Sequence, residues 1–265
     1  MNEAMALERA DTMLRELGLT RMADLLPSHA EEAARESLTY TRFIARLLDA
    51  EVEHRYQRYT AAFMRLARFP FLRTLGDFDF SFQPSIDERQ VKELATLGFV
   101  DSATNVLMLG PPGVGKTHLA VALGIEAVKR RISTYFVTAQ ELISDLRKAY
   151  LENRFERRLK LYTRPRLLIL DEMTYLPIEP ADAAHIFRVV AERYEKGSII
   201  ITSNVSYGNW GQLLGDAILA GALLDRLLHH SVTINIRGQS YRLKDKLRAG
   251  VPLPAQPTSG GGEQG

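Results

Sequence analysis

Gly110-Pro111-Pro112-Gly113-Val114-Gly115-Lys116-Thr117 is a glycine-rich loop between an apolar run at residues 106–109 and a helical pattern that continues to about residue 130. Glycines let a backbone pass close to phosphate oxygens without a Cβ clash. The N–H groups of such a loop, and the N-terminus of the helix after it, face the bound anion. Lys116 is suited to reach the β- and γ-phosphates, and Thr117 to bind Mg²⁺. Strand, loop and helix together predict that these eight residues bind a nucleoside triphosphate, and an ordinary glycine turn is disfavoured.

Apolar runs alternate with helical patterns after this loop. Runs suited to strands lie at residues 106–109, 133–137, 167–170, 198–202 and 232–236. Helical patterns lie at residues 140–162, 180–196 and 210–229, with expected breaks near Asn153, Gly215 and Gly221. Strands that alternate with helices are typical of an α/β fold, in which helices cover both faces of a parallel sheet.

The first part of the chain has helical periodicity. We expect an all-α N-terminal domain over residues 1–75, in which Gly18 ends the first helix, a polar connection surrounds Pro27, and a long apolar stripe runs from residue 43 to 66. Its expected role is oligomerisation or contact with DNA or a partner. Residues 76–250 are expected to form the ATPase domain, and residues 251–265 a disordered tail. The aromatic-rich residues 69–83 are expected to lie against the second domain.

Polar side chains follow two of the predicted strands. Ligands of an open parallel sheet bind beyond the carboxyl ends of its strands, so Asp171 and Glu172 are expected near the phosphates. Asp171 would help to hold Mg²⁺ and Glu172 would polarise the attacking water. Asn204 ends the next strand, where a neutral amide can hydrogen-bond the γ-phosphate and the water. The ordinary interpretation of Asp171 and Glu172 is an acidic turn, and that of Asn204 is a polar strand end. The phosphate loop upstream argues against both.

Two arginines late in the α/β region have a functional and an ordinary interpretation. Arg226 lies near the end of the helix before the last strand, where an arginine finger inserted into a neighbouring subunit is favoured over a surface salt bridge with Asp225. Arg242 follows the last strand. It reaches the γ-phosphate of its own subunit, or it belongs to a basic cluster that contacts DNA or solvent, and both interpretations stay open.

Two stretches carry an excess of basic residues. Arginines outnumber acids by four over residues 40–75, and lysines and arginines outnumber acids by four over residues 139–166. Either surface is a solvated helix face or a contact for nucleic-acid phosphates. The candidate DNA contacts are Arg55, Arg58 and Arg65 in the first stretch, and Arg147, Lys148, Arg154, Arg157 and Arg158 in the second.

Composition limits the alternatives. The 265 residues carry a net charge of +2, so only the distribution of charge argues for DNA. The chain has no cysteine, which excludes disulfides and thiolate metal sites and fits a reducing compartment. No apolar run approaches the length of a membrane span, and the N-terminus has no signal-peptide pattern. The expected location is cytoplasmic, without a membrane partner.

These motifs together resemble those of an AAA+ ATPase. Residues 110–117, 167–172, 199–204 and 225–226 resemble the Walker A, Walker B, sensor 1 and arginine-finger motifs, and residues 140–162 resemble the helical insertion of the initiator and helicase-loader clade. Four further phrases resemble IstB, the helper ATPase encoded beside the transposase of an insertion-sequence family: Phe78-Asp-Phe-Ser-Phe82, Arg193-Tyr-Glu195, Thr202-Ser-Asn204 and Ser240-Tyr-Arg-Leu-Lys244.

The resemblance to IstB implies ATP and Mg²⁺ as cofactors, ATP hydrolysis, and largely non-specific binding of double-stranded DNA. It also implies a homo-oligomer along the DNA, recruitment and stimulation of a cognate transposase, a sensor 2 role for Arg242, and the absence of the usual helical lid. Two alternatives stay open: a replicative helicase loader of the DnaC type, and a nucleotide-gated interaction module without a role on DNA.

Overall fold

The computed structural model describes residues 2–173 and 178–243. It divides into two compact units, Met1–Leu66 and Ala67–Gly265. The division falls nine residues before the boundary of 75/76 expected from the sequence, because the aromatic segment from Phe69 onward packs with the α/β unit. Phe69, for example, lies against Gly124 of a helix in that unit. The expected tail at residues 251–265 lies outside the described residues.

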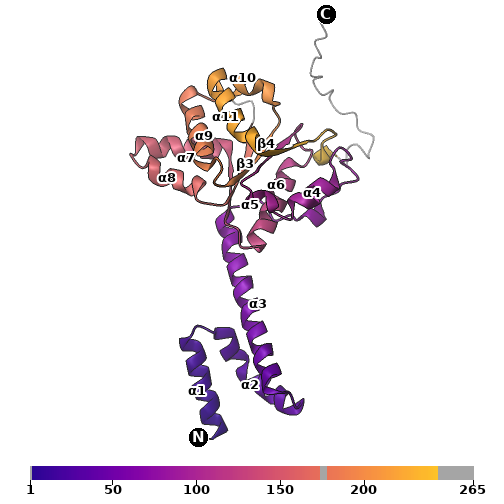
Figure 1. Cartoon of the computed structure of the whole chain (residues 1–265), viewed down its shortest axis with the longest axis vertical. Coiled ribbons are helices and arrows are strands. Elements are labelled where there is room, and N and C mark those ends of the chain that lie inside the picture. The colour runs from indigo at the N-terminus through magenta and orange to yellow at the C-terminus, as the bar shows by residue number, and fades with distance from the viewer. Residues whose placement is uncertain (1, 174–177, 244–265) are drawn as a thin grey trace, which may run out of the picture. The chain divides into compact units, whose positions relative to one another are not determined.

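The first unit contains three helices, α1 (Glu3–Glu16), α2 (Thr20–Arg35) and α3 (Tyr40–Ala67) (Figure 1). Their small core is formed by Met22, Leu26 and Leu47. Gly18 separates the first two helices with a φ of 72°, as expected. The polar connection expected around Pro27 is wrong, because Pro27 lies inside α2.

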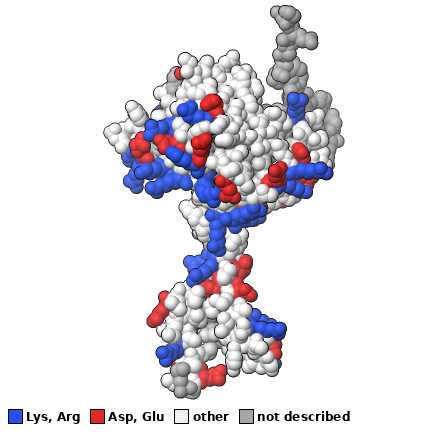
Figure 2. All heavy atoms as spheres, in the orientation of Figure 1, with Lys and Arg blue, Asp and Glu red and all other residues white. Residues whose placement is uncertain are grey.

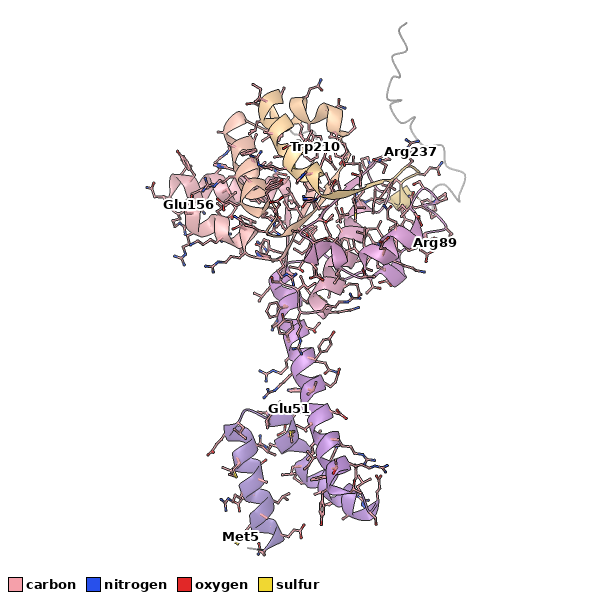
Figure 3. The ribbon with its side chains drawn as sticks, in the orientation of Figure 1. Met5, Glu51, Arg89, Glu156, Trp210 and Arg237 are labelled. Atoms are coloured by element: carbon pink, nitrogen blue, oxygen red, sulfur yellow. The ribbon has the colours of Figure 1, made fainter. Side chains whose placement is uncertain are left out.

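Glu51 connects α2 to α3 electrostatically. Its side chain, labelled in Figure 3, is 3% exposed and accepts hydrogen bonds from the backbone N–H groups of Arg21 (2.9 Å) and Met22 (3.1 Å). These N–H groups lie in the first turn of α2, which has no side-chain cap of its own. A carboxylate at a helix N-terminus stabilises it, so Glu51 takes the place of a local cap.

The second unit is built on a five-stranded parallel sheet in the order β2-β3-β4-β1-β5. All five strands predicted from the sequence are present. They are β1 (Asn105–Leu109), β2 (Thr134–Thr138), β3 (Leu167–Met173), β4 (Ser198–Ser203) and β5 (Ser231–Asn235). The central strands β1 and β4 are buried along their whole length, as expected where helices cover both faces.

Helices cover both faces of this sheet (Figure 1). On one face, Leu107, Leu168 and Ile201 belong to a large core that includes the helices after β2, β3 and β4. On the other face, Ile169 contacts Gly124 of α6, where a Cβ on the glycine would lie 2.7 Å from the isoleucine Cδ1. The α-helices of this unit are α4 (Glu88–Leu94), α5 (Gly98–Asp101), α6 (Lys116–Lys129), α7 (Ala139–Leu151), α8 (Phe155–Thr163), α9 (Pro180–Arg193), α10 (Trp210–Leu214) and α11 (Ala217–His229). Short 3-10 helices lie at Leu75–Asp77, Tyr207–Asn209 and Tyr241–Leu243.

Two of the three expected helix breaks are present. Asn153 separates α7 from α8 with a φ of 54°, and Gly215 ends α10 with a φ of 66°. The break expected at Gly221 is wrong, because α11 continues through it. Trp210, labelled in Figure 3, is buried in the core, where its indole N–H donates to the Val205 carbonyl.

Arg193, at the end of α9, fixes the start of two strands. Its guanidinium is 1% exposed and donates to the carbonyls of Tyr162 and Pro165, before β3, and of Ser198 in β4. Burial lowers the pKa of this guanidinium to about 10. The side chain therefore ties the end of α8 to the amino edge of the sheet, away from the carboxyl edge where the phosphate loop begins.

In the part of the chain after β5 that the structure describes, the 3-10 helix Tyr241–Leu243 is the last element, and no α-helical lid is present. None of the described helices is both long and apolar enough to cross a membrane.

Candidate nucleotide-binding site

The glycine-rich loop has the close packing that its glycines require. Gly113 has a φ of 80°, and a Cβ there would lie 2.0 Å from the Ser240 hydroxyl. Gly115 has a φ of 102°, and a Cβ there would lie 2.5 Å from the ring of Phe78. Both positions exclude a side chain on conformation and on space, and both residues line the adjoining cavity, as a loop that binds phosphates through its backbone requires.

Lys116 is the charged group of this loop. It is 8% exposed, and its Nζ donates to the carbonyls of Gly110 (2.6 Å) and Pro111 (2.8 Å). Burial lowers the pKa of this ammonium to about 8, and the positive charge of Arg242 acts in the same direction. A buried ammonium bound only to neutral carbonyls has no full counter-charge in these contacts, which fits a partner with phosphate oxygens.

Thr117 and Asp171 lie together at the start of α6 and the end of β3. The Thr117 hydroxyl donates to both Asp171 carboxylate oxygens, at 2.9 Å and 3.1 Å, and the Thr202 hydroxyl of β4 also donates to that carboxylate. Burial raises the pKa of Asp171. A hydroxyl and a carboxylate side by side are hard oxygen donors, and this set fits Mg²⁺.

Glu172 and Asn204 lie at the same edge of the sheet. Glu172 has a φ of 58° where the pairing of β3 with β4 is irregular, and its N–H donates to the Thr202 hydroxyl at 3.0 Å. The irregularity leaves the Glu172 side chain exposed at the cavity, whereas Asp171 is buried. Asn204 follows β4, between the strands that carry the loop and Asp171, and is half-buried.

A cavity of 410 Å³ joins the loop, Thr117, Asp171 and Glu172, whereas Asn204 does not line it. That volume suits a nucleotide-sized ligand. Its wall includes Lys116, Thr117, Asp171, Glu172 and Arg242. The structure therefore brings Arg242 to the phosphate loop, as required if Arg242 reaches the γ-phosphate of its own subunit.

The cavity also has a wall that the sequence motifs did not identify. Phe71, Arg73, Phe78 and Asp79, from the segment before the sheet, line it. The segment is held by the imidazole of His118 on α6, whose Nε2 lies 2.9 Å from the Thr74 carbonyl and whose ring contacts Phe78 edge-on. The aromatic composition of residues 69–83 was the signal, and it predicted contact with the second domain but not a share in the site.

The segment after β5 is anchored beside the loop. The N–H of Tyr241 donates to the Gly113 carbonyl at 2.9 Å. The buried side chain of Gln83 donates to the Gln239 carbonyl at 2.8 Å, and the N–H of Arg237 (labelled in Figure 3) donates to the Ser85 hydroxyl at 2.9 Å. These contacts fix the segment directly before Arg242, in a chain without a lid among its described residues.

Arg226 is separate from this cavity. It lies in the last turn of α11, donates to the Ala222 carbonyl at 2.9 Å, and its guanidinium carbon lies 4.9 Å from the centre of the Phe187 ring. No ion pair with Asp225 or another described residue is formed. Since α11 leads into the amino end of β5 and the loop follows the carboxyl end of β1, Arg226 lies at the opposite edge of the sheet from its own phosphate loop.

The candidate DNA contacts fall into two groups, those that form ion pairs within the chain and those for which the structure describes none. Arg55, Arg147, Arg154 and Arg158 form ion pairs with neighbouring carboxylates. The structure describes no ion pair for Arg58, Arg65, Lys148 or Arg157. Lys148, Arg154, Arg157, Arg158, Lys160 and Arg164 line a groove of 1080 Å³ along α7 and α8, which we name the basic groove, and blue side chains gather there in Figure 2. Lys160 and Arg164 were not among the predicted contacts.

Known proteins resemble this chain over most of its length. A family model described as IstB-like ATP binding protein matches residues 12–249. The chain is 48% identical over 241 residues to a Pseudomonas aeruginosa protein named as an ATP-binding protein of insertion sequence IS21, with 91% of each chain covered. It is 46% identical over 239 residues to one named for insertion sequence IS5376 from Geobacillus stearothermophilus, covering 90% of this chain and 95% of the relative.

Solved structures share the fold at lower identity. The crystal structure of DnaI matches with a TM-score of 0.54 and 20% identity, over 65% of this chain and 93% of that chain. AMPPCP-bound DnaA from Aquifex aeolicus matches with a TM-score of 0.51 and 23% identity, over 68% and 56%. The second unit therefore has the AAA+ fold expected from the sequence.

Proposed function

Because this chain belongs to the family of IstB-like ATP binding proteins, we propose that it is an ATPase that assembles on duplex DNA and assists a transposase. The names of its relatives support the connection with insertion sequences. The observation that carries the ATPase proposal is the cavity in which Lys116, Asp171 and Glu172 meet. It combines a phosphate-binding loop, a pair of oxygen ligands and an exposed carboxylate.

The residues of this cavity divide the work of phosphoryl transfer. Loop N–H groups and Lys116 bind the phosphates. Glu172 orients and deprotonates a water, and its exposed carboxylate is free to reach one. Asn204 follows β4 at the same edge of the sheet and does not line the cavity; its amide would hold that water and the γ-phosphate without adding charge. Arg242 neutralises charge at the γ-phosphate of the same subunit.

Mg²⁺ is the metal that this donor set suits. Thr117 and Asp171 are the residues that would hold it. Bound there, it would supply neutralisation of phosphate charge. The hydrogen bond from Thr202 keeps the Asp171 carboxylate aimed at Thr117.

DNA binding is proposed for the basic groove and for the exposed arginines of α3, Arg58 and Arg65. Phosphate contacts of this kind require charge and no base recognition. ATP between subunits would hold a homo-oligomer on the duplex, and hydrolysis would release it. The second candidate, a DnaC-type loader, shares the fold, but the relatives named for insertion sequences favour transposition.

The test combines two variants with the wild-type full-length protein. ATP turnover and retention of a labelled duplex are measured with and without ATP. We expect DNA-stimulated turnover, and ATP-dependent retention that falls steeply with salt. Glu172→Gln should keep ATP and DNA binding but lose turnover by roughly 10²-fold or more, whereas Lys116→Ala should lose ATP binding.

Two outcomes would contradict this proposal. Turnover that ignores DNA, together with no retention of the duplex with or without ATP, would favour the nucleotide-gated interaction module. Tight binding to a replicative helicase, without binding to a transposase, would favour the loader.

A further inference from the structure

The turn between α7 and α8 exposes two large apolar side chains. Tyr150 and Leu151, at the end of α7, are 65% and 75% exposed, whereas Leu142 and Leu146 on the same helix are fully buried. The core of the unit therefore uses the inner face of α7 and leaves this end uncovered. We name residues 150–155 the hairpin tip.

The hairpin tip is an ordered turn. The N–H of Asn153 donates to the Tyr150 carbonyl (3.1 Å) and the N–H of Arg154 to the Ala149 carbonyl (2.8 Å). Asn153 takes the left-handed conformation, with a φ of 54°. The Tyr150 ring is supported from behind by Phe155, with centroids 6.3 Å apart, and by His185 at 6.1 Å. The turn thus presents its aromatic and aliphatic groups from a fixed backbone.

Positive charge borders the hairpin tip. Arg154 and Arg157 line both the basic groove and a shallow 550 Å³ hollow that Tyr150 and Leu151 also line. Lys148, two residues before Tyr150, belongs to the same groove. The acids at the tip are engaged, Glu152 with Arg154 and Glu156 (labelled in Figure 3) with Arg188. Figure 2 shows blue side chains, with red ones among them, over the region of α7 and α8.

Apolar groups bordered by cations, of which Lys148 and Arg157 form no ion pair with a described residue, fit duplex DNA particularly well. A duplex offers phosphates at its rim and apolar base faces within its grooves. Cations position the backbone, and apolar wedges enter between base steps and partly unstack them. An aromatic ring such as Tyr150 stacks on any base, so this contact needs no sequence preference.

Building on the proposed DNA binding, we propose that the hairpin tip inserts Tyr150 and Leu151 against the bases of duplex DNA. The basic groove holds the flanking phosphates at the same time. The protein then distorts the duplex locally rather than only coating it.

The experiment measures base unstacking in duplexes that carry 2-aminopurine at several adenine positions, with full-length protein, Mg²⁺ and a non-hydrolysable ATP analogue. The wild type should raise the fluorescence at least about twofold, because unstacked 2-aminopurine is no longer quenched. The double variant Tyr150→Ser/Leu151→Ser should lose this rise. Its affinity should change by less than about tenfold, because lost stacking is offset by the avoided cost of unstacking.

Two controls separate the tip from its surroundings. Ile218→Ser removes an 87% exposed apolar side chain elsewhere on the same unit and should leave the fluorescence rise intact. Lys148→Gln/Arg157→Gln should instead weaken binding and lower the slope of log affinity against log salt by about two.

The outcomes distinguish this inference from the function on which it rests. A wild-type protein that binds DNA without a fluorescence rise overturns the insertion and leaves DNA binding intact. A double variant that distorts DNA as the wild type does also overturns it, and makes the tip a docking surface for a protein. A wild type that does not bind DNA overturns both.

Discussion

At the scale of single residues, the buried environment of Lys116 affects its charge. Its pKa is about 8 because burial disfavours the charged form. Phosphate oxygens favour that form, so ATP binding requires the ammonium to be protonated. Below pH 8 the lysine is already charged, and above pH 8 binding must take up a proton. We therefore expect the affinity for ATP to fall by up to about tenfold per pH unit above pH 8.

Calorimetry from pH 7 to 9.5, in two buffers that differ in ionisation enthalpy, measures both the affinity and the proton uptake. Lys116→Arg is the control, because a guanidinium stays charged throughout this range and any remaining affinity should be independent of pH. An affinity of the wild type that stays flat to pH 9.5 would contradict the low pKa.

The site residues that could be predicted from the sequence are those that belong to a short local pattern, such as a strand followed by a polar residue. The loop from Gly110 to Thr117 and the carboxylate Asp171 follow apolar strands, and the structure brings them into one cavity. Arg73, Phe78 and Gln83 were not identified as site residues. Their contacts join segments far apart in sequence, such as Gln83 with Gln239, and no local pattern records such a pairing.

At the scale of elements, the sequence predicted the end of a helix correctly where the backbone conformation of one residue ends it. Asn153 and Gly215 take positive φ and end helices. At Gly221 and Pro27 an interruption of the helix was expected and the helix continues, because packing decides the structure at both positions. Ala220 before Gly221, and Leu223 and Leu227 after it, bury α11. Met22, Ala23 and Leu26 bury α2, which continues although Pro27 lacks an N–H group.

The segment after β5 is the element whose placement matters most for the site. We expect Gln83→Leu, which keeps the volume and removes the donor to the Gln239 carbonyl, to release Arg242 from the cavity. Turnover of ATP should then fall by about fivefold, since one hydrogen bond is worth about 1 kcal/mol and positions a group that acts on the γ-phosphate. The melting temperature should change little.

A double-mutant cycle separates this positioning from a general structural effect. If Gln83 acts through Arg242, Gln83→Leu should have no further effect on turnover in an Arg242→Ala background. Additive losses would mean that Gln83 supports the cavity by another route. Ser85→Ala, which removes the parallel contact with the Arg237 N–H, should resemble Gln83→Leu in direction.

At the scale of the whole molecule, the sheet separates Arg226 from its own phosphate loop. Asn105 pairs with Ser231 at one edge and Leu109 with Asn235 at the other. Five residues of strand span about 13 Å, and α11 ends at the edge opposite the loop. Arg226 therefore serves a neighbouring site or none.

Mixing two inactive variants decides between these cases. Arg226→Ala keeps its nucleotide site and Lys116→Ala keeps its arginine. In an equal, random mixture about a quarter of the interfaces join an intact site to an intact Arg226, so about a quarter of wild-type turnover should return, because an arginine finger acts in trans. Turnover per protomer of the wild type should also rise with protein concentration. A mixture as inactive as its components, or an Arg226→Ala protein that is fully active alone, would mean that each subunit hydrolyses ATP without its neighbour.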